Sequence, residues 1–204
     1  MLILYLMTAI LLTIIASYWI DYLYALPDAP LSFKDSINQR SKYRKILYAA
    51  CMFCLIENLV AKPYPLIVYS IVAAFFLLII IFTDFEQYVI FDKVSLPFAV
   101  IGLISLFHLN LNIVNHLIAA FFGGMFFLFL ALISRGALGG GDIKLIAALG
   151  LWFGTEDLFS IITIGSIFAG ISALIMLIVN RKSRQDYFAY GPYFCMTAIY
   201  LLLR

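Results

Sequence analysis

Long apolar runs alternate with short polar segments along nearly the whole chain. Eight such runs can be distinguished, at 2–20, 46–60, 65–83, 94–109, 116–134, 144–155, 158–180 and 188–203. Runs of about 20 apolar residues predict helices that cross a membrane. The runs 46–60 and 144–155 are short for a hydrocarbon core of about 30 Å. They can span it only if flanking residues snorkel, the bilayer thins or neighbouring helices protect them. The pattern therefore predicts an all-α, polytopic membrane helical bundle with about eight transmembrane helices.

Composition agrees with this pattern and excludes a water-soluble fold. Hydrophobic residues make up 65% of the 204 positions and charged residues only 12%, which a soluble domain could not accommodate. No polar stretch is longer than a loop, so we expect a single membrane domain over 1–204.

The positions of the basic residues predict the orientation of the bundle. The first Lys or Arg is Lys34, so the opening run lacks the basic flank of a cleavable signal peptide. If all eight runs cross, 11 of the 13 basic residues fall in connections on one face, at 21–45, 84–93, 135–144 and 181–187. The positive-inside rule makes that face cytoplasmic and places the N-terminus outside. The net charge of +2 then reflects topology, and we expect no nucleic-acid partner.

Cysteines and most acidic residues suggest no further chemistry. Cys51 and Cys54 form a C-x-x-C inside an apolar run, which favours small buried helix residues because no second Cys pair or nearby His completes a zinc site. We expect no metal ion and no cofactor. Glu57 lies inside a short run, where a polar helix-packing contact is the favoured interpretation.

Two aspartates stand out because each lies where an apolar run meets the predicted cytoplasmic face. Asp84 ends the charge-free run 65–83, and Asp142 follows Gly139, Gly140 and Gly141 where the chain re-enters the membrane. Acidic groups at such depth are costly and tend to mark function. The two carboxyl groups could meet if the third and sixth spans pack side by side.

A pair of carboxyl groups suits peptide hydrolysis. One carboxylate takes a proton from water while its protonated partner polarises the scissile carbonyl. Two such charges about 4 Å apart at an effective dielectric constant of about 20 repel by about 4 kcal/mol, so one proton is shared. Glycines beside the pair allow unusual backbone angles and close approach of an extended substrate.

These residues resemble the type IV prepilin peptidases. The segments that carry the resemblance are Asp84-Phe85-Glu86-Gln87-Tyr88-Val89-Ile90-Phe91-Asp92, Gly139-Gly140-Gly141-Asp142-Ile143-Lys144 with the residues up to Gly150, and the turn Tyr190-Gly191-Pro192-Tyr193. The resemblance covers roughly residues 66–204 and implies a peptidase core over 65–204, with Asp84 and Asp142 catalytic. Gly139, Gly141 and Lys144 would bind substrate or support the site.

The resemblance also implies a substrate and a location. The substrate would be a prepilin or pseudopilin precursor, cut after its short basic leader at the cytoplasmic face of a bacterial inner membrane. Many family members also N-methylate the new terminus with S-adenosylmethionine and carry paired Cys-x-x-Cys motifs in an early cytoplasmic loop. The predicted loop at 27–45 has no cysteine, so we expect a peptidase without methyltransferase activity. Phe91 stands where the family usually has Pro.

Several alternatives remain at this stage. Glu86 and Asp92 are rival carboxylates, which we place in the interfacial turn rather than at a span end. Lys144 either stabilises the ionised site or serves only as a topology charge. A transporter could use Asp84 and Asp142 as an ion relay, although carrier sites usually lie at mid-depth on discontinuous helices. A presenilin-like intramembrane protease would use a similar Gly-x-Gly-Asp motif. Oligomeric state is left open.

Overall fold

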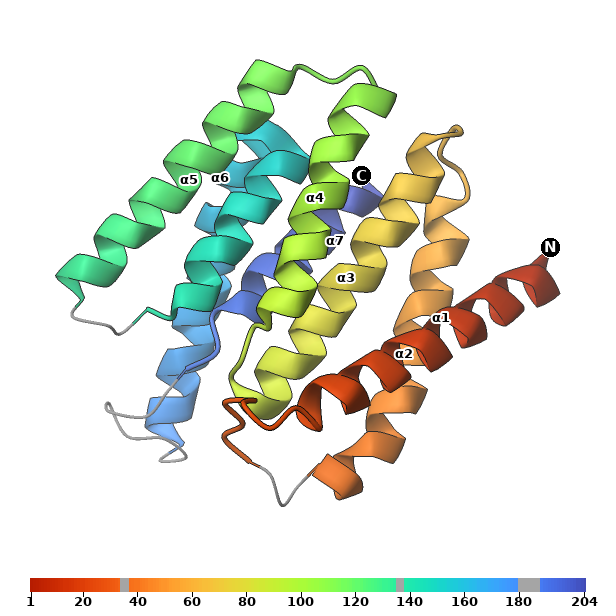
Figure 1. Ribbon diagram of the computed structural model, residues 1–204, viewed down its shortest axis with the longest axis horizontal. Helices are drawn as coiled ribbons and strands as arrows, with labels where there is room; N and C mark the ends of the chain where they lie inside the picture. Colours follow the sequence, from red (N-terminus) through yellow and green to blue (C-terminus); the bar gives the residue numbers. More distant parts are fainter. Residues whose placement is uncertain (34–36, 135–137, 180–187) are drawn as a thin grey trace.

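The protein is a bundle of helices in a computed structural model that describes residues 1–33, 37–134, 138–179 and 188–204, with the backbone alone for 37–40. No strand occurs among these residues. The helices, labelled in Figure 1, are α1 (Leu2–Tyr24), α2 (Ile37–Leu59), α3 (Leu66–Gln87), α4 (Asp92–His108), α5 (Ile113–Ile133), α6 (Gly140–Ile178) and α7 (Gly191–Leu203).

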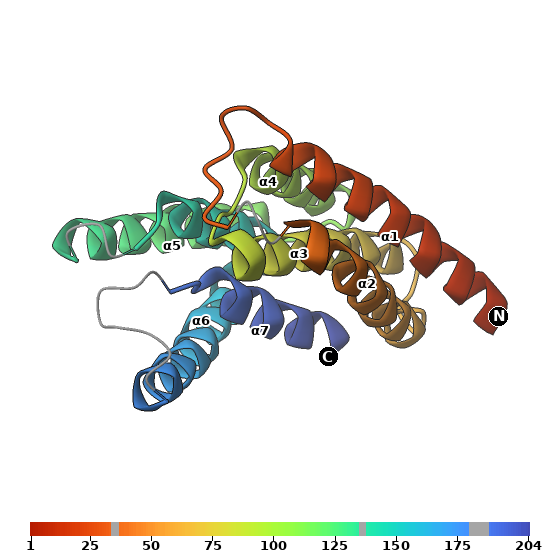
Figure 2. The ribbon, with the colours of Figure 1, turned by 90° about the horizontal axis from the view of Figure 1, so that it is seen from below.

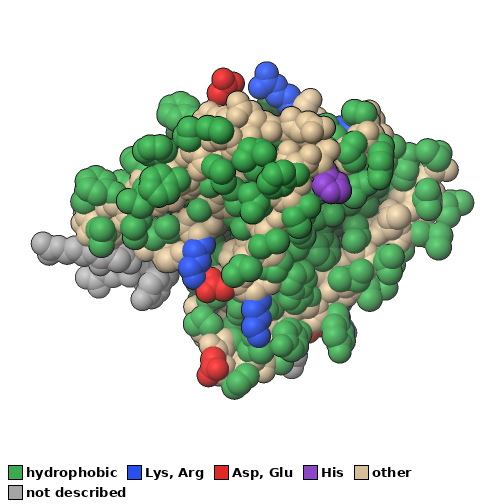
Figure 3. All heavy atoms as spheres, turned by 45° about the horizontal axis from the view of Figure 1, so that its top comes forward, with side chains coloured by type: hydrophobic (Ala, Val, Ile, Leu, Met, Phe, Trp, Pro, Cys, Tyr) green, Lys and Arg blue, Asp and Glu red, His purple; other side chains and the backbone are tan. Residues whose placement is uncertain are grey.

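The surface of this bundle is that of a membrane protein. Helices α1, α3, α5 and α6 are long and apolar enough to cross a bilayer. Large apolar side chains cover most of the face drawn in Figure 3, with a few charges between them, and α5 leaves Phe121, Phe122 and Phe129 about 60% exposed. Helices satisfy their own backbone groups and need no water there. The predicted all-α membrane bundle is therefore confirmed, while eight crossings stay a prediction.

Two predicted boundaries differ from the observed helices. The expected loop at 27–45 is shorter, because α2 begins at Ile37. The runs 144–155 and 158–180 belong to α6, which is broken at Gly154, where φ is 72° and ψ is −173°. The break explains why the apolar pattern shows two runs here.

Polar side chains of α5 stabilise the break in α6. The Nδ1 atom of His116 donates to the carbonyl oxygen of Leu151 at 2.9 Å, and the hydroxyl of Thr155 donates to Oδ1 of Asn115 at 2.6 Å. These bonds replace partners that a continuous helix would supply to the backbone and side chains on either side of the break. The first half of α6, which carries Asp142 in its first turn, is thereby a separate helical segment held by α5.

Small residues bring the helices of the core close together. A Cβ on Gly150 would lie 2.5 Å from the backbone of Ala120, and one on Gly165 would lie 2.6 Å from the ring of Phe194. Close approach at small residues is the usual basis of helix packing in membranes. Helix α7 lies between α3 and the second half of α6, as the view in Figure 2 shows.

The described helix ends agree with the predicted connectivity. The ends of α1 and α3 and the starts of α2 and α4 lie together on the lower side of Figure 1, where the sequence predicts the cytoplasmic face. Glu57 is exposed near the end of α2 instead of forming the expected packing contact. Some of the cations used for the orientation lie outside the described residues: Lys34, Arg135, Arg181, Lys182 and Arg184.

Candidate active site

The two aspartates singled out by the sequence lie in one buried cluster. Asp84 is in the last turn of α3 and Asp142 in the first turn of α6, and they are 5% and 8% exposed. A Cβ on Gly191 would lie 2.6 Å from Oδ2 of Asp84 and 3.5 Å from Oδ1 of Asp142. The two oxygens are thus no farther apart than the sum of these distances, so both can face one peptide group.

Helix α7 brings the two aspartates together. The sequence suggested that the carboxyl groups could meet if the third and sixth spans packed side by side, but α3 and α6 make few contacts with each other among the described residues. Helix α7 packs against both, and Gly191 at its start presents its backbone amide to the two carboxyl groups. Direct packing of these two spans is therefore not what joins the carboxyl groups, and the pair forms over the N-terminus of a third helix.

The facing oxygens of the pair are available for chemistry. Oδ2 of Asp84 and Oδ1 of Asp142 are buried and have no hydrogen-bond partner within the described part of the chain. An unsatisfied buried polar atom is costly and calls for a specific explanation. A shared proton, a water molecule or a substrate carbonyl between the carboxyl groups would satisfy both oxygens.

The glycines before Asp142 have different surroundings. A Cβ on Gly139 would lie 3.3 Å from Oδ2 of Asp142, and one on Gly141 would lie 2.9 Å from the Cβ of Ile90. No atom lies within 4 Å of the corresponding position on Gly140. Gly139 therefore leaves space for the carboxyl group of Asp142, and Gly141 lets the start of α6 approach Ile90 in the α3–α4 connection.

Lys144 forms its ion pair with Asp92, not with Asp142, which lies two residues before it in the sequence. Its Nζ atom lies 2.7 Å from Oδ1 and Oδ2 of Asp92, and both side chains are more than half exposed. The structure thus joins the starts of α4 and α6 at the rim of the site through this ion pair.

Both rival carboxylates have cationic partners. Asp92 pairs with Lys144, and Glu86 accepts hydrogen bonds from the hydroxyl of Tyr24 at 3.0 Å and from Nη1 of Arg44 at 2.8 Å. We expected Glu86 in the interfacial turn after the third span, but it lies in the last turn of α3 and is 8% exposed. Its helical position, two residues after Asp84, places it on the side of α3 that faces α1 and α2.

A groove of about 560 Å³ runs beside the aspartates. It is lined by three segments, the α1–α2 connection, the α3–α4 connection and the start of α6; its residues are Leu26, Pro27, Asp28, Ala29, Pro30, Val89, Ile90, Phe91, Asp92, Lys93, Gly140, Gly141 and Lys144. Ile90 links this groove to the pair, because its Cδ1 would lie 2.9 Å from a Cβ on Gly191. The groove therefore lies next to the pair, with Ile90 between them, although neither Asp84 nor Asp142 is among its lining residues.

Reasoning from the sequence missed several residues that shape this cluster. Gly191 was noted only as part of a turn, and Cys195, fully buried one turn later, lies close to both aspartates. The signal available was Pro192, since proline in the first turn of a helix marks its start. Nothing in the local sequence indicates which carboxyl groups that helix start would face.

Comparison with known proteins decides the family. The model of the type IV leader peptidase family matches residues 71–174, which is half of the chain and includes both aspartates. The chain belongs to the type IV leader peptidase family. The start of α7, including Gly191, lies beyond the matched residues.

Curated relatives agree with this family. The chain is 29% identical over 142 residues to a prepilin leader peptidase/N-methyltransferase of Legionella pneumophila, with 65% of this chain and 48% of the relative covered. It is 30% identical over 130 residues to the protein of that name from Xanthomonas campestris pv. campestris, with 61% and 45% covered. The chain spans about half the length of these relatives. No solved structure matches it.

Proposed function

We propose that this member of the type IV leader peptidase family is an aspartyl endopeptidase that cleaves the leader from prepilin or pseudopilin precursors. The observation that carries the proposal is the buried pair Asp84 and Asp142, whose facing oxygens are unpaired within the described residues. The names of the relatives, prepilin leader peptidases, support the substrate class.

The geometry supports a general acid–base mechanism. One ionised aspartate removes a proton from a water molecule, and the other, protonated, donates a hydrogen bond to the scissile carbonyl oxygen. The hydroxide attacks the carbonyl carbon, and the proton gained by the first aspartate then passes to the leaving amine. The backbone amide of Gly191 is near both carboxyl groups and orients them.

Gly139, Gly141 and Lys144 are proposed to support substrate binding. The two glycines keep the start of α6 narrow beside the groove, and Lys144 forms part of the groove wall with Asp92. An extended peptide that lies in this groove passes Ile90 and reaches the pair.

We further propose the orientation in which this site faces the cytoplasm, with the N-terminus outside and eight crossings of a bacterial inner membrane. Support comes from the charge asymmetry of the sequence. Reporter fusions at Ser41, Gln87 and Gly140 should report a cytoplasmic location, and fusions at Asn112 and Thr155 a periplasmic one. Opposite locations for Gln87 and Gly140 would contradict the proposal, because one active site cannot form across the membrane.

We propose that this protein has the peptidase activity but lacks N-methyltransferase activity. The relatives' names include both activities, but residues 27–45 contain none of the cysteines that the resemblance associates with methylation. Mass spectrometry of the cleaved product would show a free amino terminus; a methylated terminus in a host without another methyltransferase would refute this.

A transporter that uses the two aspartates as an ion relay is the second candidate. The only interrupted helix among the described ones is α6, and its break at Gly154 lies roughly 18 Å along the axis from Asp142. The pair lies at helix ends, not at such a break, which favours the peptidase.

The deciding experiment is co-expression with a pilin-like precursor, read as a change in its size. Wild-type protein should cleave it, Asp84→Asn and Asp142→Asn should each abolish cleavage, and Asp92→Asn should retain it. Membrane levels of each variant control for insertion. Cleavage by either of the first two variants above a trace would refute the assignment of the pair.

A further inference from the structure

The side chains of the last turn of α3 contact two different parts of the protein. Asp84 faces the start of α7, whereas Glu86 and Gln87 face α1, α2 and the segment that joins them. At about 100° per residue, Glu86 lies roughly 200° around the helix from Asp84. One helical turn therefore carries both the proposed catalytic group and the contacts to the N-terminal hairpin.

The described part of the α1–α2 connection, residues 25–33, is attached to α3 near both of its ends. Just before it, the hydroxyl of Tyr24 donates to Glu86 at 3.0 Å. At its other end, the backbone N–H of Phe33 donates to Oε1 of Gln87 at 2.9 Å, and Nε2 of Gln87 donates to the carbonyl oxygen of Phe33 at 3.2 Å. Gln87 is fully buried, and its side-chain amide uses both its oxygen and its nitrogen to bind the backbone of Phe33.

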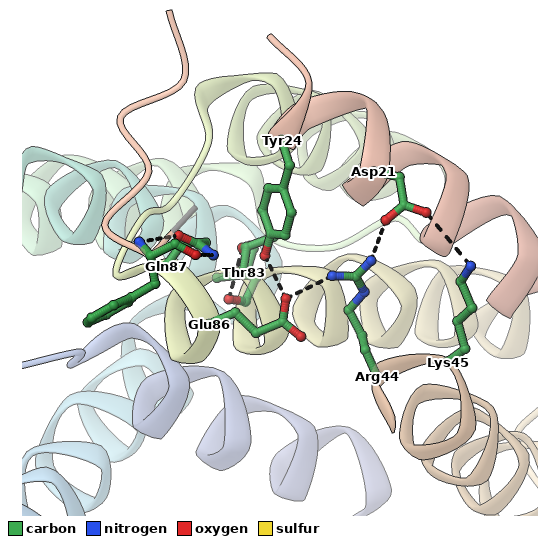
Figure 4. A network of polar contacts seen from close by, with 9 residues as sticks. Asp21, Tyr24, Arg44, Lys45, Thr83, Glu86 and Gln87 are labelled. Carbon is green, nitrogen blue, oxygen red and sulfur yellow. Dashed lines mark hydrogen bonds and ion pairs between the residues drawn. The ribbon is translucent and has the colours of Figure 1, made fainter. Parts of the chain in front are cut away.

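A buried cation reinforces the first attachment, as Figure 4 shows. Arg44 of α2, only 2% exposed, donates from Nη1 to Glu86 and from Nη2 to Asp21 of α1. Lys45, the next residue, lies 3.8 Å from the same Asp21 but is about half exposed. Three helices therefore meet at a charge cluster that includes Asp21, Tyr24, Arg44 and Glu86.

Between its two attachments the segment forms one wall of the groove beside the aspartates. Leu26 to Pro30 line the groove opposite the start of α6. Its proline residues and two internal hydrogen bonds, from Ala29 to Leu26 and from Leu31 to Ala29, limit its freedom. A wall held at both ends to the helix that carries Asp84 keeps a constant distance from the reacting groups.

We propose that Glu86 and Gln87 are positioning residues, which hold segment 25–33 as the substrate-binding wall of the groove. This inference rests on the proposed peptidase function and assigns to these residues an effect on substrate binding instead of chemistry. The expected signature is a KM that rises while kcat is unchanged, since loss of a binding wall leaves the aspartate pair in place.

The test uses the full-length protein in detergent and a pilin-like precursor that the wild type cleaves. Gln87→Met keeps the side-chain volume but removes both hydrogen bonds to Phe33, and should raise KM about tenfold with kcat within about twofold. Lys45→Gln is the matched control, because it removes an exposed cation beside Arg44, and should leave both constants unchanged.

A second variant leaves α3 untouched. Replacing both Pro27 and Pro30, which are exposed, by glycine loosens the wall and adds only backbone N–H groups that solvent can reach, and should also raise KM selectively. An unchanged KM in this variant, or a fall in kcat alone with Gln87→Met, would overturn the inference. If the wild type cleaves no precursor, the proposed function fails first and the inference falls with it.

Discussion

Replacement of Gly191 by alanine is the sharpest test of how the aspartate pair is built. The added Cβ would lie 2.6 Å from Oδ2 of Asp84 and 2.9 Å from Cδ1 of Ile90. Both distances are shorter than non-bonded contacts allow, so Asp84 or the start of α7 must shift. Asp84 is a short side chain on a buried helix turn, so rotation of its carboxyl group away from the added methyl group would change the position of Oδ2 relative to Asp142.

The expected effect is much larger on activity than on stability. Overpacking of this kind typically costs about 1–3 kcal/mol of folding free energy. A displacement of about 1 Å at reacting groups can lower a rate about a hundredfold. We therefore expect kcat for precursor cleavage to fall about a hundredfold in Gly191→Ala, while the protein still inserts and unfolds cooperatively in detergent.

The matched control is Gly170→Ala. Gly170 is an exposed residue of α6 with no atom within 4 Å of the position that a Cβ would take. Alanine there should stabilise the helix by up to about 1 kcal/mol and leave cleavage unchanged. Gly191→Ala with wild-type kcat would show that the carboxyl groups do not meet over the start of α7, and the proposed active site would be wrong.

Three further predictions concern the scaffold. Gly154→Ala should lower the free energy of unfolding in detergent by about 1–3 kcal/mol, because only glycine readily adopts φ 72° with ψ −173°; an unchanged free energy of unfolding would refute this. Arg44→Met should lower the free energy of unfolding by about 3–5 kcal/mol, because it removes a buried cation that joins Asp21 to Glu86, against less than about 0.5 kcal/mol for Lys45→Met; equal losses would contradict it. Lys144→Gln should change stability by less than about 1 kcal/mol, since its ion pair is exposed; a larger loss would disprove that.

Reasoning from the sequence succeeded where the physical signal is local. Each apolar run corresponds to a helix or, in α6, to one half of a broken helix, because a bilayer admits only segments that satisfy their own backbone groups. Asp84 and Asp142 could be named as candidates because carboxyl groups at the ends of such runs are rare and costly; their catalytic role stays a prediction. The polar cluster around Arg44 was not identifiable, since a cation near a helix end is more simply explained by topology.

The sequence by itself therefore determined the membrane class, the approximate helices and the two candidate carboxylates. The tertiary structure decided that α7 would bring these carboxylates together, that α6 would break at Gly154, and that Arg44 would join Asp21 to Glu86. The physical reason is that hydrophobic burial is governed by local pattern, whereas helix partners depend on small residues and paired polar groups far apart in the chain. In a bilayer, where lipid is as apolar as the helices, only such contacts choose between neighbours.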